Sequence, residues 1–160
     1  MNLFLLLGAN LGDRQGTFQQ ARQAIIDHIG PIIQASSLWE TAAWGLTDQP
    51  SFLNQVLLIH TALLPLEILQ RTQAIEVTLG RVRKEKWGAR LLDLDILYCG
   101  SEIYETSTLT IPHPYIAQRR FTLAPLAEIA PDFVHPVLKQ TQLELLETCS
   151  DTSAVAIFNP

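Results

Sequence analysis

The sequence predicts an α+β fold with a ferredoxin-like core, in which an antiparallel sheet is backed by two helices. Short apolar runs, continuous or alternating with polar residues, predict strands, and apolar residues three or four positions apart predict helices. Over residues 2–97 these patterns follow one another as strand, helix, strand, strand, helix, strand. This is the βαββαβ order of split βαβ folds.

The first strand and the first helix flank a turn that contains glycine. Residues 2–7 are an apolar run, and residues 8–13 (Gly-Ala-Asn-Leu-Gly-Asp) form the turn, which lacks the Gly-Lys-Ser/Thr of a P-loop. We expect a helix of about three turns with Thr17 as its N-cap and Gly30-Pro31 at its end. Its apolar face comprises Phe18, Ala21, Ile25 and Ile29.

The next four elements complete the predicted core. Residues 32–41 and 52–61 predict two strands, and residues 42–50, with their glycine, aspartate and proline, predict the loop between them. Pro65 suits the first turn of a second helix and Gly80 suits its C-terminal cap. The apolar face of this helix comprises Ile68, Thr72, Ile75 and Leu79. Residues 92–97 predict the fourth strand.

The remaining residues predict smaller elements. Residues 102–106 predict a short hairpin strand that extends the sheet, and residues 111–114 (Ile-Pro-His-Pro) predict a kinked segment. Residues 121–130 are expected to be partly helical, and residues 143–148 to form a last helix. There is no internal repeat or linker, so we expect residues 1–160 to be a single domain.

Composition narrows the class of protein. Apolar residues make up 48% and charged residues 17%, which excludes disorder. The net charge of −5 argues against general nucleic-acid binding. The two cysteines, Cys99 and Cys149, are too far apart in sequence to indicate a zinc site. Residues 1–7 are too short for a signal peptide or a membrane span, so we expect a soluble, cytoplasmic protein.

Two acidic residues in the predicted strand 92–97 are the first candidate site. Asp93 and Asp95 share one face because strand side chains alternate, and their Cβ atoms lie about 7 Å apart. At an effective dielectric of about 20, two negative charges at this spacing repel by ~2 kcal/mol. A divalent cation, or a pair of them, would offset this repulsion. The alternative is that both acids belong to the solvated face of the sheet.

A cluster of basic residues precedes the acidic strand. Five of the 11 basic residues fall within ten positions: Arg81, Arg83, Lys84, Lys86 and Arg90. A positive loop leading into an acidic strand suits a polyphosphate that carries Mg²⁺, with the metal on the acids and guanidinium groups on phosphate oxygens. A solvated charged loop is the alternative. Trp87 in the same loop either packs as a hinge or closes over a ligand.

Other residues have both a structural and a functional interpretation. Glu76, near the end of the second helix, is either solvated or paired with Arg81 or Lys84, unless it belongs to the site. His113 lies between two prolines and could form a phosphate clamp with Arg119.

Asn54, in the third strand beside Phe52, must find hydrogen-bond partners if it is buried. Its amide could instead bond to the edge of a heterocycle while an aromatic ring stacks on the face of that ligand.

These motifs together resemble a known family. Residues 86–97, preceded by Gly80-Arg81-x-Arg83, resemble the signature of the 6-hydroxymethyl-7,8-dihydropterin pyrophosphokinase family of folate biosynthesis. Residues 8–13, 39–41, 48–54 and 111–113 match further family motifs in order, so the resemblance covers about residues 3–135. Three positions depart from common family residues: Ala89, Phe52 and Pro114.

The resemblance implies an activity and a set of roles. The family transfers the β,γ-pyrophosphoryl group of ATP to the hydroxymethyl oxygen of the pterin and releases AMP. The implied catalytic residues are Arg81, Arg90, Asp93 and Asp95, with the two aspartates holding two Mg²⁺ ions. The implied ATP-binding residues are Gln73, Glu76, Arg83, Trp87, Ile96, Thr110, His113 and Arg119. The implied pterin-binding residues are Thr41, Ala42, Trp44, Phe52, Asn54 and Phe121.

Two other functions are compatible with the residues alone. A Mg²⁺-dependent nucleotidyltransferase also uses paired acids, but it attacks the α-phosphorus and releases pyrophosphate. A ferredoxin-like ligand-binding module would leave the acids as surface charge. On the resemblance, the expected ligands are ATP and the pterin, with Mg²⁺. We expect no nucleic-acid partner and no membrane.

Overall fold

The computed structural model describes residues 1–41, 51–80 and 91–160. The main sheet contains six strands, which are β1 (Asn2–Ala9), β2 (Ile32–Ala35), β3 (Trp39–Thr41), β4 (Phe52–His60), β5 (Asp93–Cys99) and β8 (Val155–Ile157). A separate two-stranded sheet is formed by β6 (Tyr104–Glu105) and β7 (Thr110–Ile111). The helices are α1 (Arg14–His28), α2 (Pro65–Thr78), α3 (Arg120–Ile129), α4 (Gln142–Glu147) and the 3₁₀ helix η1 (Ile116–Gln118).

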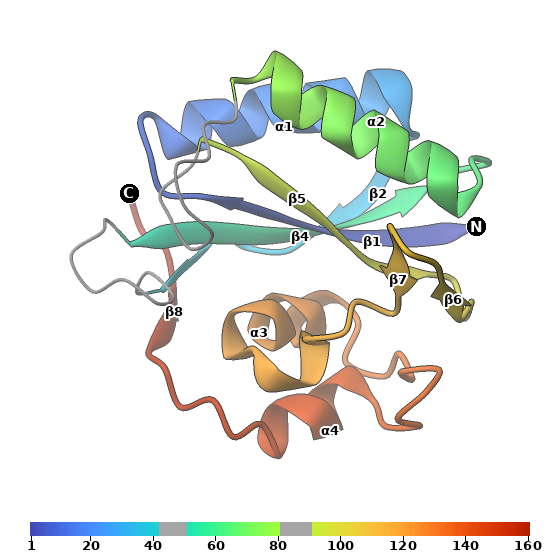
Figure 1. Cartoon of the computed structure of the whole chain (residues 1–160). Helices are drawn as coiled ribbons and strands as arrows, with labels where there is room; N and C mark the ends of the chain where they lie inside the picture. The colour runs from blue at the N-terminus through green and yellow to red at the C-terminus, as the bar shows by residue number, and fades with distance from the viewer. Residues whose placement is uncertain (42–50, 81–90) are drawn as a thin grey trace.

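The main sheet is antiparallel, with strand order β5-β1-β4-β3-β8. β2 and β3 pair with the same edge of β4, β2 along residues 57–59 and β3 along residues 52–54. β1 is an interior strand between β5 and β4, and its apolar side chains are buried on both faces of the sheet. Figure 1 shows β5 along one edge of the sheet and β8 near the opposite edge.

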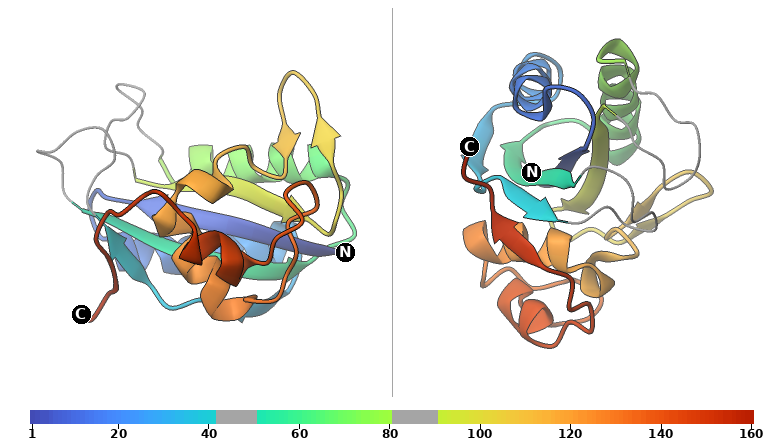
Figure 2. Two further views of the ribbon diagram at one scale, coloured as in Figure 1. Left: turned by 90° about the horizontal axis from the view of Figure 1, so that it is seen from below. Right: turned by 90° about the vertical axis from the view of Figure 1, so that its left-hand side faces the viewer.

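Helices cover both faces of the sheet, as Figures 1 and 2 show. Alternate residues of β1 belong to different cores: Leu3, Leu5 and Leu7 pack with residues of α1 and α2, whereas Phe4 and Leu6 pack with residues of α3 and α4. The sequence predicted only the layer of α1 and α2. The second layer was not predicted because α3 and α4 follow the βαββαβ core in the chain.

The predicted core elements are confirmed, with two corrections. α1 begins three residues before the expected N-cap Thr17, because the side chain of Asp13 accepts a hydrogen bond from the Gly16 backbone N–H at 3.0 Å. The predicted strand 32–41 is two strands, β2 and β3. They are separated at Ser36, whose hydroxyl accepts a hydrogen bond from the Val56 backbone N–H at 3.0 Å.

The C-terminal part of the chain brings further corrections. The predicted strand 102–106 does not extend the main sheet, because β6 pairs with β7 in a hairpin of its own. β8 was missed, since its three residues are too short for a periodic pattern and it pairs only with β3. The helices expected at 121–130 and 143–148 are confirmed as α3 and α4.

Among the residues that the structure describes, none of the helices has the length and apolar character needed to cross a membrane.

Candidate active site

A row of cross-strand partners defines one face of the sheet near its end. Gly8 of β1 pairs with Asp93 of β5 on one side and with Asn54 of β4 on the other, and Asn54 pairs with Trp39 of β3. Directly paired residues of antiparallel strands point to the same face. The three side chains of this row therefore share the face that α3 covers further along the sheet, where Leu6 of β1 is buried.

Three more predicted site residues share this face. Asp95 pairs with Leu6, and Thr41 pairs with Phe52 at the last step of the β3–β4 ladder. The sheet thus collects the predicted metal ligands and three of the predicted pterin-binding residues on one surface, although they come from three strands far apart in sequence.

The prediction that Asp93 and Asp95 share a face is confirmed. Both are half-buried and alternate with the buried residues Leu92, Leu94 and Ile96, which pack in the core on the side of α1 and α2. No group of three or more metal-binding side chains occurs within the described residues 1–41, 51–80 and 91–160.

Glu76 anchors the acidic strand to α2. Its carboxylate accepts a hydrogen bond from the Leu94 backbone N–H at 2.9 Å, between the two aspartates, and its side chain is 5% exposed. The interpretation of Glu76 as a solvated helix residue is therefore wrong. Leu69 precedes Glu76 by seven residues, two helical turns, so both lie on the side of α2 that faces β5.

A pocket of about 310 Å³ lies beside the edge strand β5. Leu69 of α2, residues 94–96 of β5 and the turn between β6 and β7 form its walls, together with His113 and Pro114. The pocket therefore brings together Asp95 and three of the predicted ATP-binding residues, namely Ile96, Thr110 and His113. Its volume is within the range of small-molecule sites. Gln73 is exposed on α2 and is not part of the lining.

His113 is held at the edge of β5 as a neutral hydrogen-bond donor. Its backbone N–H donates to Leu97 O at 3.0 Å, which attaches the segment after the cis Ile111–Pro112 peptide to the strand. Burial and the nearby Arg119 lower the pKa of His113 to about 4, although Asp93 acts in the opposite direction. Its Nδ1 accepts from the Tyr115 backbone N–H at 3.2 Å, so the proton of the neutral ring is on Nε2.

Arg119 connects the predicted phosphate site to the predicted pterin site. Its guanidinium carbon lies 4.8 Å from the ring centre of Tyr115 and 5.5 Å from that of Phe121. Stacking on two rings holds the planar guanidinium in one orientation. Arg119 directly precedes α3. The backbone N–H of Arg120, the first residue of α3, donates to the Asp151 carboxylate at 3.0 Å.

Asn54 has the strongest local indication of a ligand. Its side chain is 3% exposed, and its Nδ2 is buried without a hydrogen-bond partner among the described residues. Its partner on β1 is Gly8, where an added Cβ would lie 3.2 Å from Asn54 Oδ1. A buried amide donor without a partner is costly, so a ligand that accepts from Nδ2 would remove this cost.

Several predicted residues lie outside the described part of the chain. They are Ala42, Trp44, Arg81, Arg83, Trp87 and Arg90.

Two residues in the row of cross-strand partners were not predicted as part of the site. Trp39 was missed because its proximity to Asn54 depends on strand register, and Gly8 was assigned to a turn although it is within β1. A glycine inside a strand often marks a close approach, and that signal could have identified Gly8.

The fold and this site define an α+β protein that binds small molecules at one end of a sheet, and comparison with known proteins gives its family. The family model described as 7,8-dihydro-6-hydroxymethylpterin-pyrophosphokinase (HPPK) matches residues 4–131. The 2-amino-4-hydroxy-6-hydroxymethyldihydropteridine pyrophosphokinase of Bacillus subtilis is 45% identical over 127 residues, which are 79% of this chain and 76% of that protein. The protein of the same name from Aquifex aeolicus is 38% identical over 138 residues, 86% of each chain.

A solved structure shares the fold. The Plasmodium falciparum HPPK-DHPS crystal structure with pteroate aligns with a TM-score of 0.74 at 17% sequence identity. The alignment covers 91% of this chain and 42% of the Plasmodium chain, so this chain matches less than half of that protein. The chain is an enzyme of the pyrophosphokinase class. It belongs to the 7,8-dihydro-6-hydroxymethylpterin-pyrophosphokinase family, which confirms the resemblance found in the sequence.

Proposed function

We propose a residue-level route for the activity of this family, the transfer of pyrophosphate from ATP to hydroxymethyldihydropterin in folate biosynthesis. In this route ATP binds beside β5, the pterin binds near Asn54, and the two substrates meet at Asp93 and Asp95. The observation that carries the proposal is the shared face of Asp93, Asp95 and Asn54, because a triphosphate held at the acids then ends near a ring held at the amide.

The two aspartates fit Mg²⁺. This ion is usually bound by one or two carboxylates together with substrate phosphates and water, and Asp93 and Asp95 are two half-buried carboxylates on one face. When bound, Mg²⁺ would neutralise and orient the triphosphate. We propose that Asp93 and Asp95 hold two such ions.

The pocket beside β5 is our candidate for the nucleotide site. Leu69 and Ile96 give it an apolar wall, and the neutral His113 offers its Nε2–H to a phosphate oxygen. Arg119, oriented by Tyr115, contributes a fixed positive charge close to His113. Glu76 would act on ATP indirectly, by holding the backbone between the two acids. Arg81 and Arg90, outside the described residues, are proposed to stabilise charge on the transferred group, with Gln73, Arg83 and Trp87 also at the nucleotide.

The pterin is proposed to lie between aromatic rings. Phe52 and Phe121 would stack on its faces, and Asn54 would bond to its edge through Nδ2. Thr41, Ala42 and Trp44 complete the proposed slot. Transfer then depends mainly on positioning and on stabilisation of charge, with the hydroxymethyl oxygen in line with the β-phosphorus. No general base is assigned.

We also propose that the core is ferredoxin-like. Support comes from the order of the core strands, β5-β1-β4 followed by β2 and β3, with α1 and α2 together on one face. The single domain 1–160 and the cytoplasmic location stay predictions.

The reaction products test the function. Incubation with Mg²⁺, ATP and the reduced pterin is expected to give AMP and a pyrophosphorylated pterin, both measured by chromatography, with loss of turnover in EDTA. Release of free pyrophosphate would indicate a nucleotidyltransferase, and ADP would indicate a simple kinase. Absence of turnover would favour a ligand-binding module.

A further inference from the structure

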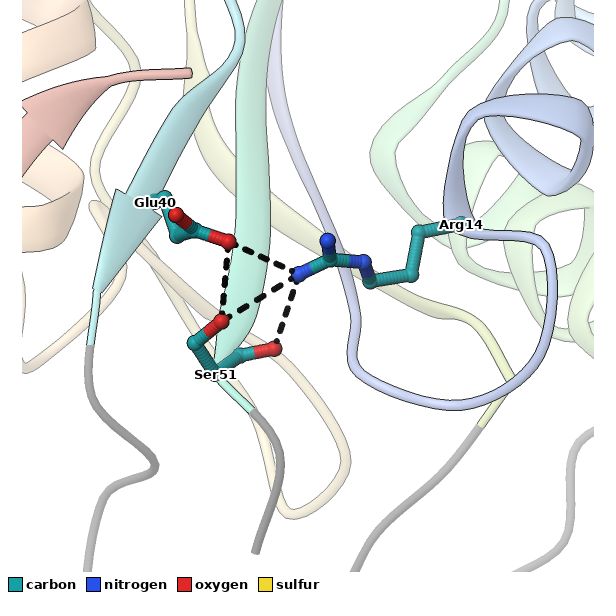
Figure 3. Close-up of polar contacts among 3 residues, drawn as sticks. All are labelled: Arg14, Glu40 and Ser51. Atoms are coloured by element: carbon teal, nitrogen blue, oxygen red, sulfur yellow. Dashed lines mark hydrogen bonds and ion pairs between the residues drawn. The ribbon is translucent and has the colours of Figure 1, made fainter. Parts of the chain in front are cut away.

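A polar cluster lies where β3 ends and β4 begins, and the proposed reaction route does not use it. Figure 3 shows the guanidinium of Arg14, the first residue of α1, pointing at Glu40 of β3 and at Ser51, which precedes β4. Arg14 Nη1 donates to Glu40 Oε2 at 3.2 Å, to Ser51 O at 3.1 Å and to Ser51 Oγ at 3.3 Å. The Ser51 hydroxyl donates to the same Glu40 oxygen at 2.9 Å. We name these three residues the strand-end cluster.

The strand-end cluster is on the reverse side of the proposed pterin slot. Glu40 pairs with Leu53, whose side chain is in the core beneath α1 and α2, so Glu40 points to that side. The neighbouring pair, Thr41 and Phe52, points to the slot. The cluster therefore links β3, through the Glu40 side chain, to the Ser51 backbone carbonyl that precedes β4, next to the last pair of the ladder, Thr41 and Phe52.

β3 is a short strand that pairs with β4 and with β8 through three residues each. Two further contacts hold the segment around it. Glu128 of α3 accepts hydrogen bonds from the Ser37 backbone N–H and the Trp39 indole N–H, both at 2.9 Å, and the Phe158 backbone N–H donates to Leu38 O at 2.8 Å. The Phe158 ring also lies 5.3 Å from the Arg14 guanidinium carbon, so it contacts the strand-end cluster itself.

Global stability does not account for the cluster. The side chains of Arg14 and Glu40 are 23% and 38% exposed, and ion pairs at such positions contribute little to the free energy of unfolding. A charged group bonded to two strand ends does restrict their local motion, which decides how precisely Thr41, Phe52 and Asn54 face a ligand.

We propose that Arg14 is a positioning residue for pterin binding, acting through Glu40 and Ser51 on Thr41, Phe52 and Asn54. This inference rests on the proposed pterin slot. Loss of the cluster weakens binding of the pterin and leaves the nucleotide site at β5 unaffected, because β5 is separated from β4 by β1.

The test compares two substrates in four variants. Arg14→Ala removes the cluster, Arg14→Lys keeps the charge without the fork, and Glu40→Gln keeps an acceptor without the charge. Thr61→Val is the matched control, because it removes a buried hydrogen bond to Ile29 O at the far end of β4. KM is measured for the reduced pterin and for ATP. The Kd of 6-hydroxymethylpterin is measured from its own fluorescence.

Arg14→Ala is expected to raise the pterin KM and Kd about tenfold, because the residues of the slot are then held less precisely, while the ATP KM changes less than about twofold. Arg14→Lys and Glu40→Gln give smaller increases, and Thr61→Val leaves the ratio of the two KM values unchanged. Equal increases for both substrates, or no increase, would overturn the proposal.

Asn54→Ala distinguishes a failure of the proposed pterin slot from a failure of the proposed role of Arg14. If Asn54→Ala leaves pterin binding intact, the slot itself is misplaced, whatever the Arg14 variants do. If Asn54→Ala weakens pterin binding and Arg14→Ala does not, only the role of the strand-end cluster is wrong.

Discussion

At the scale of the residue, Asn54 shows how a candidate binding group differs from a structural one. Gln142 is also buried, but its side chain is satisfied, because Tyr98 Oη donates to Oε1 at 3.1 Å and Nε2 donates to Phe133 O at 3.1 Å. Asn54 Nδ2 has no such partner among the described residues. The two amides should therefore respond differently to truncation.

We expect Asn54→Ala to weaken pterin binding at least about tenfold and to lower the free energy of unfolding by no more than ~1 kcal/mol, since an unpaired donor is removed. Gln142→Ala should leave pterin binding unchanged and cost about 1 to 3 kcal/mol, because it leaves the buried Tyr98 hydroxyl without its acceptor, whereas Phe133 O keeps the hydrogen bond from the backbone N–H of residue 142. Pterin titration and urea unfolding measure both quantities. A large stability loss in Asn54→Ala would indicate a structural role for this amide.

Asp95 gives a second prediction at this scale. Asp95→Ala should lower kcat/KM at least about a hundredfold by removing a proposed metal ligand, and the variant should still unfold cooperatively because the side chain is only half-buried. Asp27→Ala, which removes an exposed acid that accepts from Gln23 on α1, is the control. Near-normal turnover of Asp95→Ala at saturating Mg²⁺ would contradict the metal assignment.

At the scale of the element, β5 is an edge strand whose outer side is covered by other elements. Unpaired N–H and C=O groups of an edge strand are open to other chains. Here Glu76 of α2 accepts from Leu94 N, and the His113 backbone N–H donates to Leu97 O. The strand that carries both acids is therefore fixed by α2 and by the segment before η1.

Replacement of Glu76 tests this anchoring. Glu76→Ala should cost about 1 to 3 kcal/mol of stability by leaving a buried N–H unpaired, and kcat should fall because Leu94 separates Asp93 from Asp95. Glu76→Gln keeps an acceptor oxygen, so stability and kcat should largely recover. Urea unfolding and steady-state kinetics provide the measurements. Equal losses in both variants would show that the charge of Glu76, not its hydrogen bond, is what matters.

At the scale of the whole molecule, the buried His135 and the half-buried His113 make stability depend on pH. Burial lowers the pKa of His135, whose Nδ1 accepts from Val137 N and Leu138 N, each at 3.1 Å. Burial and Arg119 lower the pKa of His113 to about 4. In both cases the unfolded chain, with a pKa of about 6.5, binds a proton more readily than the folded protein.

The stability gained from both neutral histidines is complete above about pH 6.5 and is lost as the pH falls towards the lowered folded values. For His113 we expect a loss on the order of 1.4 kcal/mol per pH unit between about 6 and 4. Urea unfolding at pH 7, 6 and 5 measures the slope. His135→Asn keeps an acceptor that does not titrate, so the slope should decrease in this variant. An unchanged slope would show that His135 does not contribute.

The sequence by itself determined the order of the core elements, the shared face of Asp93 and Asp95, and the family. These features depend on local periodicity and on contiguous motifs, which are properties of neighbouring residues. Burial of Glu76 and the extent of α1 were not determined in this way. Glu76 bonds to a strand eighteen residues later, and Asp13 caps α1 through a turn whose geometry the pattern alone did not fix.

Only the tertiary structure decided which distant residues meet. Strand register places Asn54 between Gly8 and Trp39, and the folding of the β6–β7 hairpin and of His113 against β5 creates the pocket in which we propose that ATP binds. The tertiary structure also brings together Arg14 of α1, Glu40 of β3 and Ser51, which precedes β4. Such contacts depend on how strands pair and how helices cover them, and a one-residue shift in register would turn each side chain to the other face.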